Sequence, residues 1–185
     1  PTLALRNTIE DFRFLADHRV IGLLFDGTPS HWALQGPQYY LLAQLAWDPR
    51  QDGEAVMQDY YRRGFGPAAR AVQDYFGLME AAHLEVLNAP AWRAGMGVIR
   101  DRLSTLLPAA YSPERMRQAT ALLDRAAELA APASEALRER VAFVRTGLDF
   151  AQIILETLQV MTRVRETEGR DAGAVRRAVD LCAAR

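Results

Sequence analysis

The chain has 185 residues, of which 50% are hydrophobic and 24% are charged, so it can fill the core of one domain and is not globally disordered. Its 22 basic and 23 acidic residues give a formal net charge of −1, which argues against a nucleic-acid partner, whose phosphates require a basic surface. No apolar run approaches the roughly 18 residues of a membrane-spanning helix. The single cysteine, Cys182, excludes an internal disulfide framework.

The first predicted elements are a helix and a short strand. Thr8 is a plausible N-cap for the helix, and Ile9 and Phe12 recur behind it at helical spacing. Residues 20–25, Val-Ile-Gly-Leu-Leu-Phe, are continuously apolar, and turn-forming residues follow them at 26–30. This pattern predicts a strand that is buried on both faces, as in parallel sheets.

The predicted strand has no evident partner, because no second strand of comparable quality follows. Each buried backbone group that stays unpaired costs about 1–3 kcal/mol. Either residues 20–25 pair with chain that lies outside this sequence, or they do not form a strand. A start at Pro1 without an initiator methionine also fits a piece of a longer polypeptide, although processing or trimming gives the same start.

Helical patterns dominate the first half of the chain from Gly36 onward. The first of these helices ends at 47–49, Trp-Asp-Pro, because proline disfavours helix at the residue before it. Asp52 can cap the next helix, which runs to a break at 64–67, and another helix then continues to about Leu87.

The second half begins with the least regular stretch, residues 88–97, which is a candidate internal boundary. Ser112 predicts an N-cap with Pro113 in the first turn, and Pro132 opens the longest helix. That helix carries a heptad seam, which favours packing against neighbouring antiparallel helices and alternatively fits a dimer seam. The seam consists of Leu137, Val141, Val144, Leu148, Ala151, Leu155 and Leu158.

The chain is therefore predicted to be mainly α. Residues 1–35 form one helix–strand unit and its loop, and residues 36–185 form a helical bundle. The histidines His18, His31 and His83 lack metal-ligand spacing, and no glycine-rich phosphate loop is present. No metal site and no cofactor are predicted.

The candidate binding residues are Asp26, His31 and Trp32, which follow the predicted strand. Ligands of barrels and parallel sheets bind at the carboxyl ends of strands, where an indole can stack on a sugar and the other two side chains can hydrogen-bond. In the alternative reading, Asp26 caps a helix, His31 is simply exposed, and Trp32 plugs a barrel end. Glycoside hydrolysis needs two carboxyl groups, and this segment offers one.

Two stretches carry a family resemblance: Tyr-Tyr-Leu-Leu-Ala-Gln-Leu-Ala-Trp-Asp-Pro at 39–49, and Asp-Tyr-Tyr-Arg-Arg-Gly-Phe-Gly-Pro-Ala-Ala at 59–69, followed by Tyr75. They resemble a bacterial family described as domain of unknown function 4838. Its members are similar to glycoside hydrolases with a TIM barrel, notably α-glucuronidase-like and hexosaminidase-like enzymes. In that family a strand closes the barrel and a helical domain packs after it.

The resemblance implies that residues 1–35 are the end of a TIM barrel and that the bundle buttresses it. The implied partners are the upstream barrel of the same polypeptide and a carbohydrate, a glycoside of a uronic acid or an amino sugar. The earlier strands that would carry the catalytic carboxylates are absent from this sequence, so the chain alone is expected to be inactive. The alternative function is a free-standing helical interaction module whose groove binds a partner helix.

Overall fold

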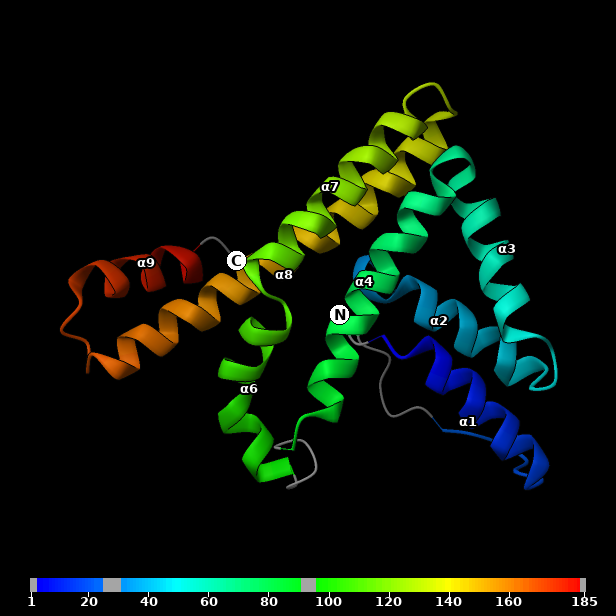
Figure 1. Ribbon diagram of the computed structural model, residues 1–185, viewed down its shortest axis with the longest axis horizontal. Coiled ribbons are helices and arrows are strands. Elements are labelled where there is room, and N and C mark those ends of the chain that lie inside the picture. The colour runs from blue at the N-terminus through cyan, green and yellow to red at the C-terminus, as the bar shows by residue number, and fades with distance from the viewer. Residues whose placement is uncertain (1–2, 25–30, 91–95, 184–185) are drawn as a thin grey trace.

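The computed structural model describes residues 3–24, 31–90 and 96–183, which are mainly α-helical, as the sequence predicts. Figure 1 shows the helices in chain order. They are α1 (Leu5–Asp17), α2 (Trp32–Trp47), α3 (Gly53–Phe65), the short 3-10 helix η1 (Gly66–Ala68), α4 (Ala69–Asn88), α6 (Met96–Ala110), α7 (Pro113–Ala130), α8 (Glu135–Glu166) and α9 (Ala172–Ala183).

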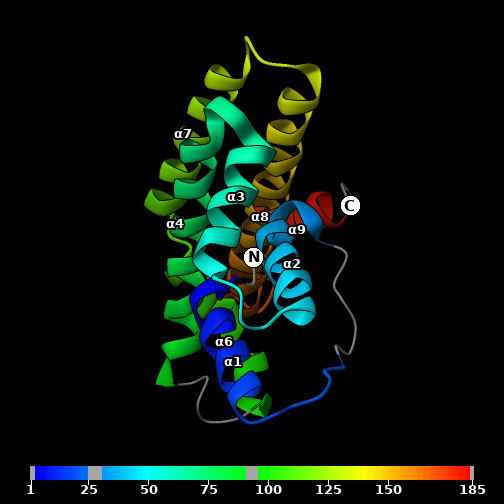
Figure 2. The same cartoon turned by 90° about the vertical axis from the view of Figure 1, so that its right-hand side faces the viewer.

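The longest helix, α8, organises the bundle. It runs antiparallel to α7, and α4 packs on α7 (Figure 1). Helix α3 packs back on α4, and α2 contacts α1, α3 and α8 (Figure 2). The C-terminal part of α8 extends away from α1–α3, and α9 folds back along it (Figure 1). One core cluster joins side chains from α1 to α8.

The heptad seam of α8 is used within the chain. Val141, Val144, Leu148 and Ala151 are buried in the same core cluster as residues of α4 and α7. This confirms the predicted intramolecular packing for these four positions. A dimer through them would require the core to open.

Two of the predicted helix caps are confirmed. The Asp52 carboxylate accepts hydrogen bonds from the backbone N–H groups of Glu54 at 3.0 Å and Ala55 at 3.3 Å. The Ser112 hydroxyl oxygen accepts one from Arg115 N–H at 3.3 Å. Each cap satisfies N–H groups that have no partner within their own helix.

The predicted N-cap at Thr8 is wrong, because α1 begins at Leu5 and includes it. The Thr8 hydroxyl donates back to the Ala4 carbonyl at 2.9 Å. The N-terminus of α1 is capped from another helix: the Glu80 carboxylate of α4 accepts from Leu5 N–H at 2.5 Å and from Arg6 N–H at 3.3 Å. Pro132 likewise precedes the longest helix rather than opening it, since α8 begins at Glu135.

The predicted strand at 20–25 is wrong for the residues described, and Phe25 lies outside them. Helix α1 ends in a turn in which Val20 N–H donates to the Leu15 carbonyl at 3.0 Å and Arg19 takes a positive φ of 55°. Residues 20–24 then form no strand, because the described part of the chain contains no strand to pair with them. The barrel fragment is therefore not shown, and Ile21 and Leu24 are 105% and 95% exposed.

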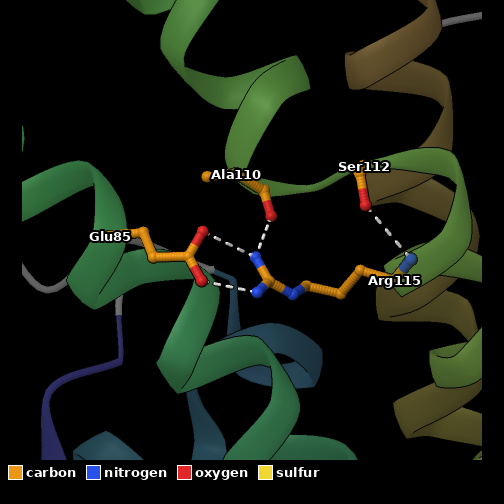
Figure 3. Close-up of polar contacts among 4 residues, drawn as sticks. All are labelled: Glu85, Ala110, Ser112 and Arg115. Atoms are coloured by element: carbon orange, nitrogen blue, oxygen red, sulfur yellow. Dashed lines mark hydrogen bonds and ion pairs between the residues drawn. The ribbon is translucent and has the colours of Figure 1, made fainter.

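A polar clamp joins α4, α6 and α7 (Figure 3). The Arg115 guanidinium binds both carboxylate oxygens of Glu85, at 2.5 and 3.0 Å, and also donates to the Ala110 carbonyl at the end of α6. The hydrogen bond from Arg115 lowers the pKa of Glu85. One side chain thus ties the start of α7 to α4 and satisfies a helix-terminal carbonyl.

None of the helices in the described part of the chain is both long and apolar enough to cross a membrane.

Candidate functional site

The structure describes two of the three residues predicted to bind a ligand, His31 and Trp32, and only Trp32 lines a groove. Asp26 lies outside the described residues. His31 immediately precedes α2, and its ring stacks on Phe150 of α8 with centroids 5.5 Å apart. Trp32 is the first residue of α2 and is 55% exposed, and it lines a groove that His31 does not line.

The groove lies between α2, α3 and α8 and has a volume of about 660 Å³, within the range of small-molecule sites. Its walls come from helices that are far apart in sequence, and Figure 2 shows how α2 and α3 approach α8. Aromatic side chains supply much of its lining: Trp32, Tyr39, Tyr40, Tyr60, Phe65, Phe76 and Phe143.

The aromatic rings hold one another in place. Trp32 lies edge-on to Tyr39 with centroids 4.6 Å apart, and Tyr40 lies 5.0 Å from Tyr60. Tyr60 also contacts Phe65 edge-on at 5.8 Å. Such pairs add about 0.5–1.5 kcal/mol each beyond the area that they bury. The lining is therefore pre-arranged for a flat or ring-shaped ligand.

Two glycines set the distances between the helices that form the groove. A Cβ placed at Gly147 of α8 would lie 2.9 Å from the backbone of Ala33, so only glycine allows α2 to approach so closely. A Cβ at Gly36 of α2 would lie 3.1 Å from the Tyr60 hydroxyl. The first contact fixes the crossing of α2 and α8, and the second holds the Tyr60 hydroxyl against α2.

The only carboxylate among the described lining residues, Asp59, is held in ion pairs. It binds Arg63 at 2.6 Å and also binds Arg62. The hydrogen bond from Arg63 is the largest influence on Asp59 and lowers its pKa. With one ion-paired carboxylate, these residues do not supply the two carboxyl groups that glycoside hydrolysis needs.

Arg140 of α8 is the other cation of the groove. Its Nη1 donates to the carbonyls of Gly64 at 3.2 Å and Arg63 at 3.5 Å. Both carbonyls lie in the last turn of α3, where a positive charge is favourable. No carboxylate in the described part of the chain forms an ion pair with Arg140.

The Tyr60 hydroxyl is protonated near neutral pH like any tyrosine, and burial raises its pKa further, to about 12. It can therefore donate a hydrogen bond to a ligand in the groove. No three His, Cys, Asp or Glu side chains of the described residues are grouped to hold a metal ion. The arrangement is suited to binding, through stacking, one donor hydroxyl and one cation.

The sequence patterns do not identify Tyr60, Arg140 and Phe143 as site residues. Tyr60 lies in one of the stretches that carry the family resemblance, and those stretches at 39–49 and 59–69 meet in the groove. Arg140 and Phe143 lie outside these two stretches. They read as exposed positions beside a heptad seam, and only the crossing of α8 with α2 and α3 brings them to the site.

Residues 4–77 match the model of the family described as Domain of unknown function (DUF4838). The match covers α1 to α3 and the first part of α4, and it supports the resemblance over this part of the chain. The wall of the groove that α8 contributes lies outside it. No curated protein and no solved structure shows significant similarity to the chain.

Proposed function

We propose that the chain is the C-terminal helical region of a carbohydrate-active, glycoside-hydrolase-like protein, where it buttresses the barrel and lines part of a sugar cleft. The match of residues 4–77 supports the family resemblance from which the proposal starts. The observation that carries it is the exposed apolar run at 20–24, which lies between α1 and the start of α2.

The exposure of this run is unusual for a folded surface. Ile21 and Leu24 are essentially fully exposed, and Val20 and Leu23 are each 45% exposed. Contiguous apolar patches of this kind mark interaction surfaces. Covering a fully exposed leucine or isoleucine contributes about 1.5–3 kcal/mol, so Ile21 and Leu24 together could contribute about 3–6 kcal/mol to docking on a barrel.

Hydrogen exchange tests the docking directly. We expect the amides of residues 20–24, apart from the Val20 amide that donates to Leu15, to exchange rapidly in this chain and much more slowly in the protein encoded by the complete open reading frame. The double variant Ile21→Ser, Leu24→Ser should restore rapid exchange in the longer protein, whereas Val175→Ser, an apolar position on α9, should not. Equal exchange of 20–24 in the short and the long protein would contradict the proposal.

The isolated chain should not hydrolyse glycosides. Its groove offers Asp59 alone among described carboxylates, and Arg62 and Arg63 bind that carboxylate. Aryl glycosides of glucuronic acid and of N-acetylhexosamines are suitable substrates for the assay. Turnover by the purified chain that Trp32→Ala abolishes would show that the catalytic groups are present after all.

The alternative, a helical interaction module, is less well supported. Its dimeric form would use the seam of α8, and Val141, Val144, Leu148 and Ala151 are already buried within the chain. A dimer that dissociates on dilution and is lost in the variant Leu155→Gln would favour the module over the carbohydrate-active protein.

A further inference from the structure

The charge of Arg140 is not compensated within the groove. Its Nη1 is engaged by two carbonyls of α3, while no described residue accepts a hydrogen bond from its Nη2 or Nε. Arg63, the other arginine of the lining, is paired with Asp59. The guanidinium of Arg140 therefore keeps donors for a further acceptor, and a carboxylate matches their fork-like geometry.

Exposed aromatic faces lie in the same groove as this cation. Trp32 and Phe143 are 55% and 54% exposed, although both line the groove. Phe143 lies three residues after Arg140 on α8, so the two side chains lie on one face of the helix. The groove thus combines large faces for a ring with a positive charge at its edge.

The Tyr60 hydroxyl adds a directional donor. It lies against Gly36 and has no hydrogen-bond partner among the described residues. A ligand that fits all three features has a ring with an apolar face, hydroxyl groups and a carboxylate. An uncharged sugar would leave the Arg140 donors unused, and a simple carboxylate would leave the aromatic faces bare.

We propose that the groove between α2, α3 and α8 binds an acidic sugar unit, with its carboxylate on Arg140, its ring against Trp32 and Phe143, and a ring oxygen accepting from Tyr60. The choice of a sugar rests on the proposed function, whereas the preference for a carboxylate comes from Arg140 itself. Arg140 would then have two roles, since it also binds the C-terminal carbonyls of α3.

Protein NMR with defined small molecules tests the inference on the chain as it stands. D-glucuronate should shift the Trp32 indole N–H signal and amide signals around Tyr60 and Phe143. D-glucose should bind about tenfold more weakly or worse, because it lacks the charge-assisted hydrogen bonds. Benzoate and acetate at equal concentration should bind more weakly than glucuronate, since neither offers both the hydroxyl groups and the carboxylate on one ring.

Arg140→Gln should abolish the preference for glucuronate over glucose and keep an N–H donor for the α3 carbonyls. Arg138→Gln is the matched control, because Arg138 lies two residues earlier on α8, also donates to a carbonyl, and does not line this groove. Melting temperatures of both variants report whether they are folded. If Arg140→Gln is unfolded, Trp32→Ala takes its place and should weaken both sugars.

Several results would overturn the inference. They are equal binding of glucuronate and glucose to the unaltered chain, binding of neither sugar, and an undiminished preference for glucuronate in a folded Arg140→Gln variant. Stronger binding of benzoate than glucuronate would also overturn it, in favour of an aromatic acid. None of these results affects the hydrogen exchange of residues 20–24, so the proposed docking on a barrel is tested independently of the groove.

Discussion

The contact between Gly147 and Ala33 predicts that Gly147→Ala destabilises the protein, although helix propensity alone predicts that it stabilises it. Alanine in place of glycine inside an exposed helix stabilises by about 1 kcal/mol. At Gly147, however, the new Cβ would lie 2.9 Å from the carbonyl carbon and oxygen of Ala33 and 3.0 Å from its Cβ. Backbone atoms cannot rotate away as the end of a side chain can, so α2 and α8 would have to separate.

Forcing an extra methyl group into such a contact typically costs about 1–3 kcal/mol. After the propensity gain is subtracted, Gly147→Ala should lower the free energy of unfolding by up to about 2 kcal/mol. Gly77 is the matched control, because it also lies inside a helix, α4, and a Cβ there would meet nothing within 4 Å. Gly77→Ala should raise the free energy of unfolding by up to about 1 kcal/mol.

Urea denaturation of the three proteins, followed by far-UV circular dichroism, measures these differences. The difference between the two variants is the sharper quantity, because the propensity term is common to both. It should amount to about 1–3 kcal/mol. If Gly147→Ala is as stable as Gly77→Ala, the close crossing of α2 and α8 is refuted. An intermediate result with a shifted Trp32 signal would show that α2 moves while the core holds.

Three further predictions concern single side chains. Tyr75 is fully buried, and its hydroxyl has no hydrogen-bond partner among the described residues. Tyr75→Phe should therefore leave the free energy of unfolding in urea unchanged or raise it by up to about 1 kcal/mol. A clear decrease would show that the hydroxyl has a partner. Burial lowers the pKa of His83 to about 4, below its value in the unfolded chain. Between these two pKa values the unfolded chain binds more protons, so the free energy of unfolding should decrease as the pH is lowered from 6.5 to 4. After allowance for solvent screening, this decrease amounts to about 1 kcal/mol at pH 5, and His83→Gln should remove it. Arg115→Met should lower the free energy of unfolding by about 1 kcal/mol at neutral pH. The loss should become smaller in acid, where Glu85, whose pKa Arg115 lowers, becomes protonated. An equal loss at pH 3 and pH 7 would exclude the ion pair as its source.

Local signals in the sequence predicted most helix boundaries well. The caps at Asp52 and Ser112 depend on residues two or three positions away, so a sequence pattern contains all the information needed. The start of α1 could not be found in this way. The group that caps it, the Glu80 carboxylate, comes from α4 and is 75 positions from Leu5 in the chain. Tertiary contact, not local sequence, therefore decides where that helix begins.

The apolar run at 20–25 misled for a different reason. A continuous apolar run shows that a segment can be buried, but a strand also needs a neighbour whose backbone groups are extended alongside it. The described part of the chain provides no such neighbour. The described part of the run, residues 20–24, is exposed and forms no strand, and the proposed docking on a barrel would explain this exposure. The predicted role of Asp26 remains untested, since it lies outside them.

The crossing of α2 and α8 beside the groove involves two residues that are unusual inside helices, Pro37 in α2 and Gly147 in α8. Pro37 lies inside α2 and has no N–H, so it cannot donate to the carbonyl of Ala33, four residues before it. That carbonyl lies against Gly147 of α8, where an added Cβ would come within 2.9 Å of it. Gly147 thus lets α8 pack closely on the turn of α2 in which the proline removes one N–H donor, and Trp32 and Phe143 of these two helices line the same groove. Helix patterns show Pro37 and Gly147 only as local irregularities, and the contact of Gly147 with Ala33 shows how the two helices come together.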